Sequence, residues 1–231
     1  MEKGKKMSTT NFDEITYGDP NSDILLIQMT GDHEQEAMER EVSLIRELSG
    51  VDAFCFKAVK VVDWNRDLSP WSAPAVFGNE DFGDGAPDTL KFLTDNILSD
   101  VGSRRMGEAP DKKIYLGGYS LAGLFSLWAG YQTDAFDGIA AASPSVWFPG
   151  FTNYMRENTF FPKKIYLSMG DREEKTRNPV MSQVGNKIRE CEEILKKVTV
   201  DCILEWNQGN HFKEPELRTA KAFAYLIKSK K

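Results

Sequence analysis

One serine, Ser120, is flanked by small residues at the point where a strand pattern gives way to a helix pattern. Gly118, two residues before it, and Ala122, two residues after it, leave room for a tight turn that lifts the hydroxyl clear of a sheet. This arrangement is a relaxed form of the nucleophile elbow G-x-S-x-G, because alanine stands at the second glycine position. A serine held in this way can attack a carbonyl carbon, so the predicted chemistry is acyl transfer through a covalent intermediate.

A serine hydroxyl is a weak nucleophile at neutral pH and needs a base within hydrogen-bond reach, usually a histidine. The chain has 2 histidines, His33 and His211. His211 lies just beyond the last predicted strand, whereas His33 follows the first one. Serine enzymes with a nucleophile elbow follow the chain order serine, acid, histidine. We therefore expect His211 to be the base, and His33 to lie near the mouth of the site or at a helix start.

The acid that orients such a histidine should come from the loop after the penultimate strand, where the chain offers several carboxylates. The spacing from Gly170 selects Glu173, whereas closeness to the strand end selects Asp171; we favour Glu173, and Asp171 remains a candidate. Glu174 is a third carboxylate in the same loop. The alternative for most of these charges is a solvated loop of surface ion pairs, which contributes little energy.

A tetrahedral oxyanion needs preorganised donors, and the loss of one typically costs ~3 kcal/mol of transition-state stabilisation. The position of the elbow predicts the backbone N–H of Leu121 as one donor. The other is expected from the loop after the first strand, at Thr30 or Gly31. Gly31 is equally consistent with a simple strand-to-helix turn.

Strand and helix patterns alternate along the chain, and this alternation predicts the elements that must position these side chains. Because such alternation is typical of right-handed crossover connections, we expect a mostly parallel sheet of about six or more strands with helices on both faces. Active sites of these sheets lie at the carboxyl ends of the strands. Strand patterns cover residues 24–29, 53–62, 114–116, 138–142, 164–169 and 199–206, and helix patterns cover residues 34–48, 88–101, 121–131, 182–197 and 216–227.

Composition is that of an ordinary globular protein, with 231 residues, 41% hydrophobic and 28% charged residues. We expect one α/β domain over residues 1–231, with residues 1–10 as a flexible tail. The formal net charge of -6 provides no basic surface for nucleic acid. The basic start at residues 1–10 is followed by no apolar region of a secretory leader, and no stretch approaches the ~20 apolar residues of a membrane span, so we expect neither secretion nor membrane insertion.

Cysteine usage favours a reduced, cytoplasmic setting. The 3 cysteines are an odd number and have no CxxC spacing. A cysteine nucleophile at Cys55 or Cys202 is the less favoured alternative to Ser120.

A polar and aromatic stretch at residues 63–87 is too rich in aromatics for a flexible linker, so we expect an ordered excursion close to the site. Trp64 and Trp71 of this stretch, together with Trp147, could line an acyl pocket, and Arg66 could meet an anionic group of a substrate. The alternative is that the tryptophans anchor the excursion to the core and that Arg66 pairs with a neighbouring aspartate.

Four short motifs together resemble the esterase family of α/β-hydrolases that includes esterase D-like and siderophore-esterase-like enzymes. The resemblance extends from about residue 24 to residue 227, and the segment 63–71 is also similar to small bacterial members. It implies the α/β-hydrolase fold without a large cap domain, and carboxylester hydrolysis with Ser120 as nucleophile and His211 as base. The acid carries over less directly than Ser120 and His211, because related siderophore esterases support the histidine in different ways. The motifs are Gly-Gly-Tyr-Ser-Leu-Ala-Gly-Leu-Phe (117–125), Ala-Ala-Ser-Pro-Ser-Val-Trp (141–147), Gly-Asp-Arg-Glu-Glu-Lys-Thr (170–176) and Gly-Asn-His-Phe (209–212).

The expected function is therefore hydrolysis of a small-molecule ester by a serine enzyme that needs no metal or organic cofactor. Acyltransferase, thioesterase and peptidase chemistry use the same three side chains and remain alternatives, since a fold does not define a reaction. A non-catalytic binding protein on the same fold is a further alternative.

Overall fold

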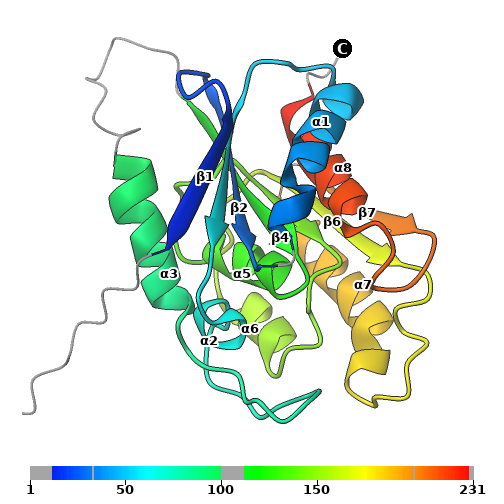
Figure 1. Ribbon diagram of the computed structural model, residues 1–231. Coiled ribbons are helices and arrows are strands. Elements are labelled where there is room, and N and C mark those ends of the chain that lie inside the picture. Colours follow the sequence, from blue (N-terminus) through cyan, green and yellow to red (C-terminus); the bar gives the residue numbers. More distant parts are fainter. Residues whose placement is uncertain (1–11, 33, 100–111, 200, 229–231) are drawn as a thin grey trace, which may run out of the picture.

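The computed structural model of the protein describes residues 12–32, 34–99, 112–199 and 201–228 (Figure 1). Three expectations lie outside these residues: the position of His33, the tail at residues 1–10, and the end of the helix expected to reach residue 101.

The core of the fold is a 7-stranded sheet with the order β1-β3-β2-β4-β5-β6-β7. β1 pairs antiparallel with β3, and all other neighbours pair parallel. After β2, the chain adds β3 on one side of β2 and then β4 on its other side. The direction of winding therefore reverses between β2 and β4. Ligands of such sheets bind beside this reversal, at the carboxyl ends of the strands. The strands are β1 (Asp13–Gly18), β2 (Ile24–Thr30), β3 (Cys55–Lys60), β4 (Lys113–Tyr119), β5 (Gly138–Ala142), β6 (Lys164–Gly170) and β7 (Asp201–Asn207).

Helices cover both faces of the sheet, as Figure 1 shows. α1 (Met38–Ser49) and α8 (Pro215–Ile227) lie side by side on one face, and α5 (Leu121–Ala129) and α7 (Val184–Leu195) cover the other. Successive side chains of a strand point to opposite faces of the sheet. In β2, Leu26 therefore packs in the core under α1 and α8, whereas Leu25 and Ile27 pack in the core under α5 and α7.

Helix boundaries differ from those expected at several places. The helix expected over 34–48 begins as the 3₁₀ turn η1 (Gln35–Ala37) and ends where Gly50 adopts a φ of 70°. The helix expected to start at residue 88 starts earlier, as α3 (Ala86–Phe92), because Pro87 fits the first turn of a helix. It continues as the π-helical segment η2 (Leu93–Leu98), and α7 is likewise preceded by a 3₁₀ turn, η3 (Met181–Gln183).

The sequence patterns did not predict three short elements, α2 (Trp64–Asp67), α6 (Phe151–Glu157) and the edge strand β1. The helices are too short for a hydrophobic period to be recognised. β1 lies at the sheet edge and its side chains are mostly exposed, so it has no continuous apolar run. Among the described residues, no helix has the length and apolar character needed to cross a bilayer.

The stretch 63–87 is folded against the body of the protein. It contains α2 and an antiparallel bridge between Ala73 and Phe82. The ring of Phe82 packs against those of Trp147 and Phe148, with ring centroids 5.9 and 5.2 Å away. Trp71 Nε1 donates to the carbonyl of Pro149 at 3.0 Å. Aromatic packing therefore holds this stretch in place.

Candidate active site

Ser120 occupies the turn between β4 and α5 with a φ of 57° and a ψ of -119°. A non-glycine residue with positive φ is strained, so the surrounding structure must hold it there. A side chain at position 118 would place its Cβ 2.6 Å from that of Ala122, which explains the glycine. Ala122 itself is fully buried, so alanine fits the second small position of the motif.

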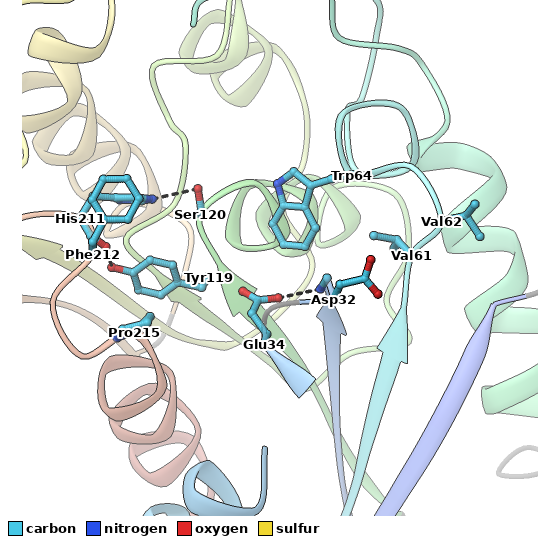
Figure 2. Close-up of a pocket in the computed structure, with 11 residues that line it drawn as sticks. Asp32, Glu34, Val61, Val62, Trp64, Tyr119, Ser120, His211, Phe212 and Pro215 are labelled. Atoms are coloured by element: carbon cyan, nitrogen blue, oxygen red, sulfur yellow. Dashed lines mark hydrogen bonds between the residues drawn. The ribbon is translucent and has the colours of Figure 1, made fainter. Parts of the chain in front are cut away.

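His211 links Ser120 to a carboxylate. Its Nε2 lies 3.0 Å from Ser120 Oγ, as Figure 2 shows. Its Nδ1 lies 2.7 Å from Glu173 Oε2. Since a carboxylate only accepts hydrogen bonds, Nδ1 carries the proton and the lone pair of Nε2 faces the serine. This tautomer is the one that can take a proton from the serine hydroxyl.

Glu173 is buried, with 4% of its side chain exposed, and its second oxygen has several donors. Oε1 accepts from the N–H of Gly170 at 2.7 Å, from Ser143 Oγ at 2.8 Å and from Arg218 Nη1 at 2.9 Å. Burial alone would raise the pKa of Glu173, but its hydrogen bond to His211 and the donors on Oε1 outweigh burial and lower that pKa. The carboxylate therefore stays ionised.

Arg218 of α8 is buried and connects several loops at this end of the sheet. Its guanidinium also donates to the hydroxyl of Tyr119 at 3.1 Å and to the carbonyl of Asn210 at 2.9 Å. Tyr119 in turn donates to the carbonyl of His211 at 2.6 Å, and burial raises the pKa of Tyr119 to about 12, so the hydroxyl keeps its proton. Sequence reasoning missed Arg218. Its spacing could have indicated it. Arg218 lies four residues before the buried Ala222, on the same face of the helix, and a buried charge needs a partner.

The other two acids of the loop do not contact the histidine. Asp171 Oδ1 accepts from the N–H of Gly209 at 2.8 Å and so supports the loop that carries His211. Glu174 faces Arg189, with Oε2 3.9 Å from Nη1. Of the three carboxylates, the structure brings only Glu173 to the imidazole.

Ser145 is a second hydroxyl beside Ser120 that sequence reasoning missed. Its Oγ lies 3.3 Å from Ser120 Oγ, and its N–H donates to the carbonyl of Ser120 at 3.0 Å. Ser145 is buried in the loop after β5, within the motif Ala-Ala-Ser-Pro-Ser-Val-Trp. The sequence analysis identified this motif, but its spacing from Ser120 did not indicate that Ser145 lies beside the nucleophile.

The three backbone positions expected to supply oxyanion donors, Leu121, Gly31 and Thr30, differ in their hydrogen-bond partners. Leu121 is the first residue of α5, where the N–H groups of a helix have no partner within the helix. The N–H of Gly31 donates to Glu34 Oε2 at 2.8 Å. Thr30 is completely buried at the end of β2, and its carbonyl accepts from the N–H of Val61 at 3.0 Å.

A pocket of about 550 Å³ opens above Ser120 and His211. Of the four residues expected to bind substrate, Trp64 is part of its lining, and Arg66, Trp71 and Trp147 are not. Arg66 instead donates to Asp67 Oδ1 through Nε at 2.8 Å and Nη2 at 2.7 Å. The lining residues are Gly31, Asp32, Glu34, Val61, Val62, Trp64, Tyr119, Ser120, His211, Phe212 and Pro215.

Glu34 lies on the pocket wall beside Trp64, as Figure 2 shows. Burial raises the pKa of Glu34 to about 7, and the hydrogen bond from Gly31 opposes this shift only in part. Sequence reasoning did not single out this residue. Within the described part of the chain, no group of three or more histidine, cysteine or carboxylate side chains could hold a metal ion.

Comparison with models of protein families gives no match to this chain, and neither does comparison with curated protein sequences. Solved structures do match. The siderophore hydrolase EstA from Aspergillus nidulans superposes with a TM-score of 0.65 at 15% identity, over 98% of this chain and 97% of that one. An IroE-like serine hydrolase from Shewanella oneidensis gives 0.72 at 13% identity, over 94% and 75%.

The enterobactin esterase FES from Shigella flexneri gives a TM-score of 0.63 at 14% identity, over 93% of this chain and 59% of that one. These matches and the strand order confirm the fold expected from the sequence motifs. The chain has the α/β-hydrolase fold of the siderophore and ester hydrolases that it resembles.

Proposed function

We propose that the protein is a serine carboxylesterase that hydrolyses a small-molecule ester through an acyl-enzyme on Ser120. One observation carries the proposal: a continuous chain of hydrogen bonds runs from Ser120 through His211 to Glu173 at the base of a pocket. The names of the matched structures, which include a siderophore hydrolase and an enterobactin esterase, support ester hydrolysis as the reaction.

The proposed reaction starts when His211 Nε2 takes the proton of Ser120 Oγ as this oxygen attacks the ester carbonyl. The N–H of Leu121, at the start of a helix, is the first donor to the developing oxyanion. The second donor is proposed at the end of β2, at Thr30 or at Gly31, whose N–H donates to Glu34 Oε2 in the structure. Glu173 stabilises the imidazolium in both half-reactions.

His211 then gives its proton to the leaving alcohol, and the ester bond breaks to leave the acyl group on Ser120. Water enters next. His211 accepts a proton from this water while the water oxygen attacks the acyl carbon. The bond between the acyl carbon and Ser120 Oγ then breaks, His211 returns the proton to Ser120 Oγ, and the acid leaves. Because both steps use the same base, one imidazole serves the whole cycle.

Active-site labelling tests the proposal directly. A fluorophosphonate probe should label the wild-type protein and the variant Ser43→Ala, whose exchanged serine is exposed on α1. The variant Ser120→Ala should remain folded and unlabelled. A folded wild-type protein that resists the probe would instead favour a non-catalytic binding role.

Product analysis separates the alternative reactions that use the same side chains. Wild type and Ser120→Ala are compared on esters, thioesters and peptides, with and without added alcohol acceptors. We expect hydrolysis of esters in preference to the other bonds, with water as acceptor. Faster turnover with an added alcohol, and formation of a new ester, would identify an acyltransferase.

A further inference from the structure

The carboxylate of Glu34 lies inside the pocket next to an aromatic ring. A methyl group placed on Gly31 would lie 3.3 Å from Trp64 Cε3 and 4.0 Å from Glu34 Oε2. The ring and the carboxylate therefore border the same small space, on the side of the pocket opposite His211 in Figure 2. A group bound there would contact both of them.

Two carboxylates, Asp32 and Glu34, line this pocket, and no lysine or arginine of the described residues does. Asp32 Oδ1 pairs with Lys60 Nζ at 2.5 Å. Glu34 has no lysine or arginine within ion-pair distance among the residues that the structure describes, and its hydrogen bond comes from the N–H of Gly31. Its negative charge is therefore not balanced by a cation of the protein in that part of the chain.

More acidic groups lie behind Glu34. A smaller cavity of about 60 Å³ shares Glu34 and Tyr119 with the main pocket and is also lined by Glu41 and Glu216. Glu216 pairs with Arg40 at 3.0 Å. Burial raises the pKa of Glu41 well above its ordinary value, and the charge of Glu34 adds to this effect. Glu34 thus remains a carboxylate without a cation partner among the described residues, and its ionised form attracts a positive charge and repels a negative one.

An ammonium group suits such a place, because the face of an aromatic ring and a carboxylate both attract cations. Given the proposed esterase function, we propose that Glu34 and Trp64 form a subsite for the ammonium group of the substrate. The enzyme then prefers esters that carry a positively charged nitrogen to neutral esters of the same shape. Anionic esters are disfavoured at this subsite.

The test compares two esters of one shape, butyrylcholine and 3,3-dimethylbutyl butyrate, which differ in a charged nitrogen against a neutral carbon. The kcat/KM of each is measured at pH 8.5 by titration of the released acid. We expect the preference for butyrylcholine to fall about tenfold or more in Glu34→Gln, as one lost ion-pair contact predicts. The two leaving alcohols differ in reactivity, but this difference cancels when the two proteins are compared.

The matched control is Glu36→Gln, which removes an exposed carboxylate from the neighbouring turn η1 that does not line the pocket. It should keep the wild-type preference. An equal preference in wild type and Glu34→Gln would overturn the proposed subsite. If both esters are hydrolysed in that case, the esterase function stands, whereas failure to hydrolyse either ester counts against the function itself.

A binding measurement keeps the proposal testable if Glu34→Gln does not fold. Tetraethylammonium is titrated calorimetrically into His211→Ala, so that no imidazole lies in the pocket. Since the pKa of Glu34 is about 7, its ionised fraction and the affinity should rise about tenfold between pH 6 and pH 8.5. Asp32, Glu41, Glu216 and Tyr119 also face this region. Tetraethylammonium that does not bind at pH 8.5, where the carboxylate of Glu34 is ionised, would refute the subsite.

Discussion

Replacement of Glu173 by glutamine provides a direct test of how this site works. Three donors converge on Oε1, from Gly170, Ser143 and Arg218, at 2.7, 2.8 and 2.9 Å. A glutamine must therefore place its carbonyl oxygen at this position, because its NH₂ group would meet donors there. The NH₂ group then faces His211 Nδ1, where the carboxylate had accepted a hydrogen bond at 2.7 Å.

This orientation reverses the tautomer of the histidine. Nδ1 must accept from the amide, so the proton moves to Nε2, and Nε2 can no longer take the proton of Ser120. In the serine-protease template, the corresponding change lowers kcat about 10⁴-fold, which corresponds to ~5 kcal/mol of transition-state stabilisation. We expect a loss of the same order for Glu173→Gln on a neutral 4-nitrophenyl ester, mostly in kcat.

Two variants of the same loop serve as controls. Glu174→Gln changes an acid that faces Arg189, and it should keep the wild-type rate. Asp171→Asn retains an oxygen that can accept from the N–H of Gly209, so we expect a loss of less than about tenfold. A loss below about 100-fold for Glu173→Gln, with Arg218 in place and the fold intact, would refute the tautomer argument.

Three further substitutions have effects that follow from the packing and the charges. Gly118→Ala should cost about 1–3 kcal/mol in urea unfolding, because its Cβ would lie 2.6 Å from that of Ala122. Arg218→Met leaves the buried charge of Glu173 without its cation, so we expect a loss of about 3–5 kcal/mol and an acid limb of the kcat/KM profile that moves to higher pH. Glu34→Gln should stabilise the protein by roughly 1–2 kcal/mol at pH 8 and by little at pH 4, when measured by thermal unfolding.

The sign of the Glu34 effect follows from its raised pKa. The folded protein binds this proton up to a pH of about 7, whereas the unfolded chain releases it near its ordinary value, so ionisation costs stability as the pH rises between the two. For Glu173 the sign is opposite, because folding lowers its pKa. The stabilisation that Glu173 contributes is present above the pKa that it has in the unfolded chain, and it is lost as the pH falls through the pKa of the folded protein. Equal effects of Glu34→Gln at pH 8 and pH 4, unchanged unfolding of Gly118→Ala, or an unshifted acid limb for Arg218→Met would each contradict the corresponding argument.

Local sequence patterns were sufficient for the order of the main elements and for the position of the elbow. Apolar runs determine strands that are buried on both faces, and these patterns predicted the parallel strands and the helices that alternate with them. They failed for β1, which is largely exposed, and for α6, which is too short to show a period. The place of Ser120 between β4 and α5 follows from its small neighbours alone, since the tight turn depends on residues within two positions of it.

The sequence by itself thus determined the α/β architecture and the arrangement of Ser120 and His211 at the carboxyl ends of two strands. Only the tertiary structure decided which acid meets the imidazole, that Arg218 lies behind it, and that Glu34 accepts from Gly31 in the pocket. The physical reason is that these contacts, apart from the short one to Gly31, join segments far apart in the chain. Their side-chain directions depend on how the strands are ordered and how the loops pack, and no local period encodes either.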